Sequence, residues 1–476
     1  MTGGQKGKFE SGQVCRRLPA FWKNMRAGAQ KGAALVTVLL LTLLLLVFAG
    51  SLVQLTTVDR RVAASQVAMT RALYLAEAGV EMMVARLAGN FDAGPPSTPI
   101  VLGNGQISKI TVSPVDAGTR EILAEGRAGN ARRALKVRVQ RTAATVLQNA
   151  ACSGGSLGLS GSVSITGNLL VNGDLDVNSG AGISGAGRLV VKGNLTNKSG
   201  TNKSDKKNEG INISPGGSLL VGGDLDNKHG RIETPGYLQV DGTIDNAGGT
   251  VIFSPGGAYY TPSTEYPAGT FITQDARQVP CLNGPRENIA DLVEPAARLD
   301  PAGKVAAYQG YPSLPVTRKG NKYEFDFTGK TDGAYYLDTA TLSDGDKDKG
   351  KQVNEDQKIQ LSGTYSGKWL IAVKGNVEIS GDLQPANANQ DALVMLVDGT
   401  VSIQGNENVS AVIYACRFEA GGSSTIRGTV VAQSFDVSGN ASLIQDNDLI
   451  RNAVPELPSD LVTVKIISWR EEYDVF

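Results

Sequence analysis

LLVNGDL at residues 169–175 is the first of four strings with the pattern Leu-x-Val-x-Gly-x-Leu/Ile. LVVKGNL, LLVGGDL and LQVDGTI begin at residues 189, 219 and 238, so the intervals are 20, 30 and 19 residues. The longest interval contains the polar string NKSGTNKSDKKNEG, which is typical of an extra loop. Short apolar runs that recur with glycine turns about every 20 residues predict a β-solenoid with one coil per repeat.

The repeat returns in the second half of the chain. IAVKGNV begins at residue 371 and MLVDGTV at residue 395, and the same texture continues to residue 440. We expect Leu, Val and Ile to stack inward from coil to coil. The glycine at the fifth position permits a positive φ or a tight corner; the glycines are Gly173, Gly193, Gly223, Gly242 and Gly375. The sequence therefore predicts an α+β chain whose residues 151–256 and 361–476 form two parts of a parallel β-helix, with LVTVKIISW in a C-terminal cap. A β-sandwich is the alternative, because short strands and glycine turns recur there too.

Residues 257–360 interrupt the repeat with a segment rich in tyrosine, proline and charge. We expect an insertion that projects from the solenoid, whose tyrosines either form a binding face or pack a small core of their own. Asp344, Asp346, Asp348 and Glu355 mimic the ligand spacing of an EF-hand loop, but Lys349 stands where that loop has glycine. A solvated charged loop is the preferred interpretation, and no metal site is predicted.

Residues 91–150 precede the solenoid. Three alternating stretches, 107–112, 120–126 and 134–141, predict three short strands joined by turns. We expect a small sheet that packs on the end of a preceding helix.

The chain begins with a basic segment followed by an uncharged apolar run. Residues 1–32 contain seven lysines and arginines against Glu10 alone, a net charge of +6, and no charged side chain lies between Gly32 and Val58. Residues 33–50 are long enough to span a bilayer as a helix, and the cations before them place the N-terminus in the cytoplasm. A secretory signal peptide cut after Ala49 and a plain membrane anchor are the alternatives.

Apolar residues then recur at steps of three and four from Leu55 to Leu87, with Gln66 as the one polar place in the series. This seam predicts a single helix over residues 33–89 that ends at Gly89 and Asn90. The first part of this helix is uniformly apolar, as expected of a helix in a lipid bilayer. The remainder is amphipathic, as expected of a helix that packs in a bundle of similar helices.

QKGAALVTVLLLTLLLLVFAG and RALYLAEAGVEMMVARL resemble the N-terminus of PilX-type minor pilins of the type IV pilus and of the related K-type minor pseudopilins of type II secretion. The resemblance covers roughly residues 30–90. It implies that a prepilin peptidase cuts between Gly32 and Ala33, behind Lys31, so that residues 1–32 are a cytoplasmic leader. It also implies a methylated new N-terminus and, as partners, other pilin or pseudopilin subunits bound through the helix.

Two features depart from this family. Its members usually carry glutamate at the fifth mature position, where Thr37 stands, and threonine offers a neighbouring ammonium a hydrogen bond but no countercharge. Because subunits that lack this glutamate include the one at the filament tip, we expect a tip or initiating role. The leader is also long, and a start at Met25 in place of Met1 would give the more typical leader MRAGAQKG.

Composition excludes several kinds of site. One histidine, His229, excludes any mechanism that needs a histidine pair, and no cofactor is predicted. The chain after residue 32 has 39 basic and 45 acidic side chains, a net charge of −6, so nucleic-acid binding is not predicted. Cys152, Cys281 and Cys416 allow one disulfide and a free thiol, but their wide spacing resembles neither a metal knuckle nor a redox motif.

We therefore predict a non-enzymatic minor pilin or pseudopilin subunit, anchored in the membrane, whose exported head serves assembly or adhesion outside the cell or in the periplasm. An alternative is an extracellular polysaccharide-active β-helix enzyme, which would need paired acids on one solenoid face. The acids at the repeated turn, Asp174, Asp224 and Asp241, follow glycine corners as turn residues do. A second alternative is a membrane-anchored surface adhesin or scaffold unrelated to pili, with a surface polysaccharide among its candidate ligands.

Overall fold

The computed structural model describes residues 31–116, 118–178, 180–199, 210–228, 230–246, 251–253, 258–259, 271–272, 278–279, 286–292, 299–320, 322–342 and 358–472. Contacts divide the chain into two compact units, one up to Thr70 and one from Arg71 onward. A long helix, α1 (Lys31–Gly89), contributes residues to both units, and every described strand belongs to the second. The helix ends where Gly89 and Asn90 were expected to stop it, and the Asn90 N–H still donates to the Arg86 carbonyl.

The residues that follow α1 form an antiparallel sheet of five strands, in the order β1-β2-β3-β4-β31. The bounds are β1 (Ile100–Leu102), β2 (Gly105–Pro114), β3 (Thr119–Ala128), β4 (Ala131–Ala143) and β31 (Val462–Glu472). The three predicted strands are β2, β3 and β4. Their alternating apolar side chains, such as Leu135, Val137 and Val139, form one core with the last turns of α1.

The fifth strand differs from its expected role as a cap on the end of the solenoid. β31 pairs antiparallel with β4 over nearly its whole length, from Val462 opposite Ala143 to Glu472 opposite Ala134. Alternation predicts a strand but not its partner, and the open edge of β4 offers a full row of backbone donors and acceptors.

Most of the rest of the second unit is a β-solenoid whose sheet has 24 described strands, all in parallel pairs except β21, which pairs antiparallel with β22. Its first half contains β5 (Ala151–Ser153), β6 (Leu157–Leu159), β7 (Ser164–Thr166), β8 (Leu169–Val171), β9 (Leu175–Val177), β10 (Gly182–Val191), β11 (Leu195–Asn197), β12 (Gly210–Val221), β13 (Leu225–Asn227), β14 (Arg231–Glu233), β15 (Leu238–Val240), β16 (Ile244–Asn246), β17 (Val251–Phe253) and β18 (Ala258–Tyr259). Its second half contains β21 (Thr317–Lys319), β22 (Lys322–Asp326), β23 (Gly333–Asp338), β24 (Lys358–Tyr365), β25 (Lys368–Lys374), β26 (Asn376–Pro385), β27 (Ala392–Gly405), β28 (Asn408–Gly422), β29 (Thr425–Val437) and β30 (Ser442–Gln445). The two-stranded pair β19 (Phe271–Ile272) and β20 (Gln278–Val279) lies outside this sheet.

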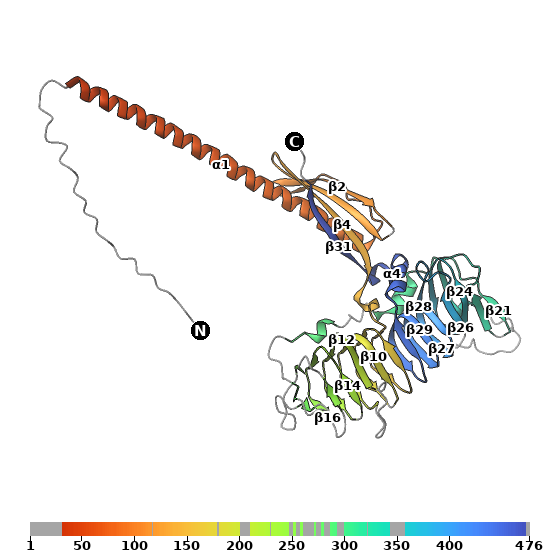
Figure 1. Ribbon diagram of the computed structural model, residues 1–476. Helices are drawn as coiled ribbons and strands as arrows, with labels where there is room; N and C mark the ends of the chain where they lie inside the picture. Colours follow the sequence, from red (N-terminus) through yellow and green to blue (C-terminus); the bar gives the residue numbers. More distant parts are fainter. Residues whose placement is uncertain are drawn as a thin grey trace. The chain divides into compact units, whose positions relative to one another are not determined.

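The repeats stack in register, as their period predicts. Equivalent inward positions pair strand to strand in one buried ladder: Ile371, Met395, Ile413, Val430, Ala151, Leu169, Leu189, Leu219 and Leu238. Parallel pairing throughout the repeats confirms the β-helix, and it excludes the β-sandwich, whose sheets are antiparallel (Figure 1).

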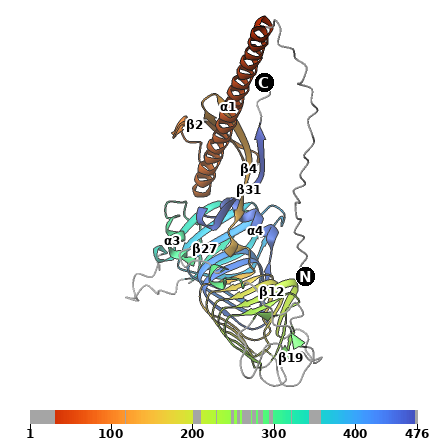
Figure 2. The ribbon, with the colours of Figure 1, turned by 90° about the vertical axis from the view of Figure 1, so that its left-hand side faces the viewer.

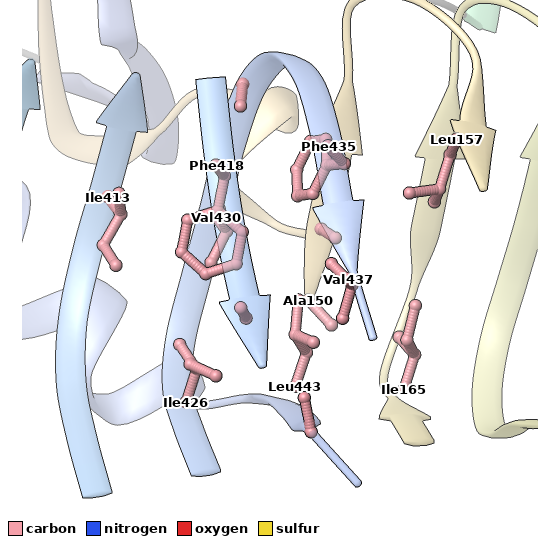
Figure 3. Close-up of a cluster of buried hydrophobic side chains, with 14 of the residues drawn as sticks. Ala150, Leu157, Ile165, Ile413, Phe418, Ile426, Val430, Phe435, Val437 and Leu443 are labelled. Atoms are coloured by element: carbon pink, nitrogen blue, oxygen red, sulfur yellow. The ribbon is translucent and has the colours of Figure 1, made fainter. Parts of the chain in front are cut away.

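The two halves of the solenoid meet at its middle. β29, near the end of the second half, pairs parallel with β5 and β6 at the start of the first half. Figure 3 shows the seam, where Phe435 lies beside Leu157 and Leu443 lies near Ile165. Along the solenoid axis the order is therefore residues 317–445 followed by residues 151–259, so that the chain enters and leaves at adjacent coils.

The second half of the solenoid begins earlier than expected. β22 and β23 pair parallel with β24 and β25, so residues 317–338 belong to the solenoid and not to the predicted insertion. Three aromatic residues of the segment that suggested an insertion, Phe325, Phe327 and Tyr335, instead pack inside these coils. Phe325, Phe327, Tyr335 and Trp369 contact one another with ring centroids 4.9–5.9 Å apart.

Short helices cover one outward face of the solenoid. They are η1 (Thr145–Leu147), α2 (Ile289–Leu292), α3 (Pro301–Ala306), α4 (Asn447–Ala453), η4 (Val454–Glu456) and η5 (Ser459–Leu461); a further short helix, η3 (Thr339–Thr341), directly follows β23. Figure 2 shows α3 and α4 beside β27. The covered strands point apolar side chains outward as well as inward; for example, Val190 and Leu220 pack against Ile289 of α2. This double-sided burial explains the nearly continuous apolar runs of these strands.

Candidate functional site

The first unit presents an uncovered apolar helix. Between Leu35 and Phe48 the large apolar side chains of α1 are 57–70% exposed. Its most apolar 18-residue window has a mean hydropathy of 2.7 and no buried residue, so its length and composition suit a membrane span. The hydroxyls of Thr42 and Ser51 donate to the carbonyls of Val38 and Val47, at 3.0 and 2.8 Å, so the helix itself satisfies them in an apolar medium.

The predicted processing site lies at the start of this helix. α1 begins at Lys31, and Gly32 and Ala33 are in its first turn. The rest of the leader and the side chains of residues 31–34 lie outside the described residues. Thr37 lies on the exposed surface of the helix. The cleavage point and the meaning of Thr37 stay predictions.

The predicted apolar seam divides into two parts. Leu55, Val58, Val62 and Met69 are 42–64% exposed. Further along α1 the seam is buried against the five-stranded sheet, at Ala76, Val80, Met83 and Leu87. The first part is therefore available to other molecules, whereas the second part holds the chain's own sheet.

Small residues let α1 lie directly on the sheet. A Cβ added at Gly126 of β3 would lie 2.6 Å from the Ala76 nitrogen and 2.9 Å from the Leu75 Cβ, and closer still to the Ala72 carbonyl. A Cβ at Gly79 would lie 3.1 Å from the Ala124 Cβ. The AEAG string thus places an alanine and a glycine at the point of closest helix-to-sheet approach.

A neck of two strands joins the sheet to the solenoid. The Ala144 N–H donates to the Leu461 carbonyl at 2.9 Å, directly beyond the last β4–β31 pair. The Arg141 guanidinium donates to the carbonyls of Pro455 and Leu457 at 3.1 and 2.6 Å. Burial lowers the pKa of Arg141, but arginine stays charged at any ordinary pH. Arg141 therefore fixes the returning chain to β4.

The acids at the repeated turn hold successive coils together. The Asp174 carboxylate accepts the Asn194 N–H at 2.7 Å, and the Asn194 side chain accepts the Asp224 N–H at 2.8 Å. Asp224 in turn accepts the Thr243 N–H at 2.7 Å, and this hydrogen bond lowers the pKa of Asp224. Asp241 accepts from the Gln239 amide at 3.0 Å. These contacts give Asp174, Asp224 and Asp241 structural roles at the turns, as expected of turn residues.

The glycines of the repeat work in two ways. Gly375 has a φ of +126°, where a side chain is strained. Gly193 and Gly223 do not lie in that region, but an added Cβ would be 2.8 Å from the Gly173 carbonyl oxygen and 2.9 Å from that of Gly193. These corners of the first half therefore need glycine because the backbone of the neighbouring coil leaves no room for a Cβ atom.

Two of the three cysteines considered for a disulfide lie in different strands of the solenoid. Cys152 is buried in β5, and Cys416 is partly buried in β28. Burial, followed by the nearby Asp398, raises the pKa of Cys416 to about 11. Cys152 and Cys416 do not form a disulfide with each other, because each occupies its own place in the coil stack, and a disulfide that involves Cys281 stays a prediction. Cys281, His229 and the EF-hand-like string lie outside the described residues.

The N-terminal segment matches a known family. Residues 31–81 match the PilX N-terminal family. The predicted resemblance to PilX-type minor pilins is thereby confirmed for α1, from its first residue into the part that packs on the sheet. Residues 317–452 match a domain of unknown function (DUF7305), which corresponds to the second half of the solenoid from β21 to α4.

A solved structure, the competence-associated pilin ComZ from Thermus thermophilus, is 13% identical to the chain, with a TM-score of 0.29. The match covers 85% of this chain and 97% of ComZ. At this TM-score the likeness carries no argument about fold or function. No curated protein matches the chain.

Sequence patterns did not predict the neck or the covering of the solenoid. Arg141 lies in an ordinary alternating strand, and its carbonyl partners are more than 300 residues away in sequence. The sequence contained one indication that short helices cover the solenoid. The repeats have apolar residues at outward positions, and a solenoid face in contact with water would be polar there.

Proposed function

We propose that this chain is a minor pilin-like subunit that is inserted in the membrane, cut by a prepilin peptidase between Gly32 and Ala33, and incorporated into a type IV pilus-like filament. The PilX-type segment is the observation that carries the proposal. Its exposed apolar stretch supplies the membrane span, and its last turns carry the five-stranded sheet.

Charge and packing support each step. The basic leader retains the N-terminus in the cytoplasm, and cutting after Gly32 removes its whole net charge of +6. The exposed seam from Leu55 to Met69 then offers other pilin-like helices an apolar stripe. Other pilin or pseudopilin subunits and the peptidase are therefore the proposed partners.

A place at the filament tip is the finer part of the proposal. Thr37 cannot supply the countercharge that a subunit above would require. The solenoid extends in both directions from the coils that the neck joins. Such a head is more easily accommodated at an end than between neighbours along a shaft. Immunogold labelling of filaments with antibodies to the solenoid should therefore mark tips, and regular labelling along the shaft would contradict this placement.

The mature N-terminus tests the proposal directly. Co-expression of the full chain with a prepilin peptidase should yield a chain that begins at N-methylated Ala33, as measured by intact mass and N-terminal peptide mapping. Gly32→Leu should block the cut, whereas Gly50→Ala should not affect it, because Gly50 has no neighbour within 4 Å. An uncut chain would favour the anchored adhesin or scaffold, and a cut after Ala49 would favour a secreted protein.

A further inference from the structure

A cleft lies where the cover of the solenoid meets the chain that returns to the neck. Its volume is about 460 Å³, within the range of small-molecule sites. One wall is α3 with the residues around it, and the other is the turn at residues 458–460 before β31. Its lining includes Asp300, Lys304, Tyr308, Tyr311, Ser459 and Asp460.

Two tyrosines form the aromatic wall. The rings of Tyr308 and Tyr311 lie 5.0 Å apart at 49° to each other. Tyr311 is 48% exposed, so its ring is available to a ligand. Burial raises the pKa of Tyr308 to about 12, which keeps its hydroxyl protonated and able to donate. The wall thus combines apolar ring area with hydroxyl groups.

Charged side chains of both signs line the cleft. The Lys304 ammonium is buried, contacts the Asp460 carboxylate and lies 5.2 Å from the centroid of the Tyr414 ring. The Asp460 side chain remains 49% exposed beside it. Asp300 is exposed at the start of α3 and makes no capping hydrogen bond to that helix. The rim therefore offers two carboxylate acceptors and the Ser459 hydroxyl, while the Lys304 ammonium is buried against Asp460.

We propose that this cleft binds a neutral saccharide unit. A sugar ring presents a C–H face that packs on an aromatic ring and a rim of hydroxyls that both donate and accept. An anionic ligand would meet the exposed carboxylates of Asp300 and Asp460, so charge disfavours it. Asp460 already has the buried Lys304 ammonium as its partner, so it offers a cationic ligand little uncompensated charge. The inference rests on the proposed function to the extent that an exported head would meet surface glycans.

The full chain in detergent micelles, with saturation-transfer difference NMR, tests the proposal. The probes are D-glucose, D-galactose and N-acetyl-D-glucosamine, with choline as a cationic probe and acetate as an anionic one. We expect saturation transfer to the ring C–H protons of at least one sugar. Tyr311→Ala should weaken that binding by about tenfold or more, since exposed aromatic anchors dominate such contacts. Tyr311→Phe should retain it because the ring remains.

Trp469→Ala is the matched control. Trp469 is exposed to the same 48% as Tyr311 but lies on β31, away from the cleft lining. The proposal would be overturned if Trp469→Ala lost sugar binding or if Tyr311→Ala retained it. It would also be overturned if the wild type bound no sugar, or bound choline or acetate more strongly than any sugar. The mature N-terminus is measured separately. A chain that is cut before Ala33 but binds no sugar would therefore contradict the saccharide proposal and leave the proposed function intact.

Discussion

Gly126 provides the sharpest test of how α1 carries the sheet. A methyl group in Gly126→Ala would lie 2.6 Å from the Ala76 nitrogen and 2.9 Å from the Leu75 Cβ. Ordinary contacts begin near 3.4 Å, so the helix and β3 must separate by roughly 1 Å, and overpacking of this kind costs about 1–3 kcal/mol. Gly94→Ala is the matched control, because Gly94 has no neighbour within 4 Å and no positive φ.

Hydrogen exchange of the full chain in lipid nanodiscs, measured by mass spectrometry, reports the loss of local stability peptide by peptide. A loss of about 1–3 kcal/mol should raise exchange in peptides from the end of α1 and from β3 by about 5- to 150-fold. Peptides from β27 and β28 should stay at their wild-type rates and serve as the internal reference. Unchanged exchange in α1 and β3, or an equal rise in the solenoid, would refute the close-packing argument.

The neck and the coil corners give two further predictions. Arg141→Met should remove the two hydrogen bonds to the carbonyls of Pro455 and Leu457, which are worth about 1.5–3 kcal/mol each because the donor is charged. Limited proteolysis should therefore cut the chain near η4 much faster than in the wild type. An unchanged cleavage rate would contradict the role of Arg141. The lowered pKa of Asp224 means that its stabilisation is complete above its unfolded value, near 4, and is lost as the pH falls through its lower folded value. Asp224→Asn should therefore keep the acceptor, as Asn194 does one coil earlier, and flatten the pH dependence of the thermal midpoint below pH 4. Asp224→Ala should lose about 0.5–1.5 kcal/mol above pH 4, and this difference from the wild type should shrink as the pH falls. Identical acid unfolding of the wild type and Asp224→Asn would contradict the assignment.

The coil register could be predicted from the sequence because stacking in a solenoid couples nearest neighbours of like pattern. Leu169, Leu189, Leu219 and Leu238 pair in the order in which their repeats occur. The junction of the two halves could not be predicted in this way. It pairs Val430 with Ala151, and the strands around these residues lack the shared pattern. Local periodicity contains no information about which distant coil ends meet.

The candidate site shows the same division. The membrane span and the AEAG contact follow from residue types within a few helical turns, and both lie in the segment that matches a family model. Arg141, Lys304 and the saccharide cleft depend on segments that are far apart in sequence, such as residues 300–311 and 458–460. Tyrosines in the predicted insertion had two interpretations, a binding face or a core. Tyr335 packs against Trp369, so the core interpretation holds for this residue, whereas Tyr311 remains exposed in the cleft and its role in binding stays a proposal.

The position of β31 links completion of the sheet to completion of the solenoid. β4 leaves the sheet at Ala143, and its edge is covered only by a strand that begins at Val462, after every solenoid coil. Contacts of such high sequence separation form late, because loop closure must be completed first. Under the proposed topology the apolar helix is in the membrane long before β31 reaches the sheet. The open edge of β4 would thus persist until the solenoid has closed β29 against β5, and only then would Arg141 secure the returning chain. A subunit whose sheet is finished by its own last strand therefore presents a complete sheet only after the whole head has folded.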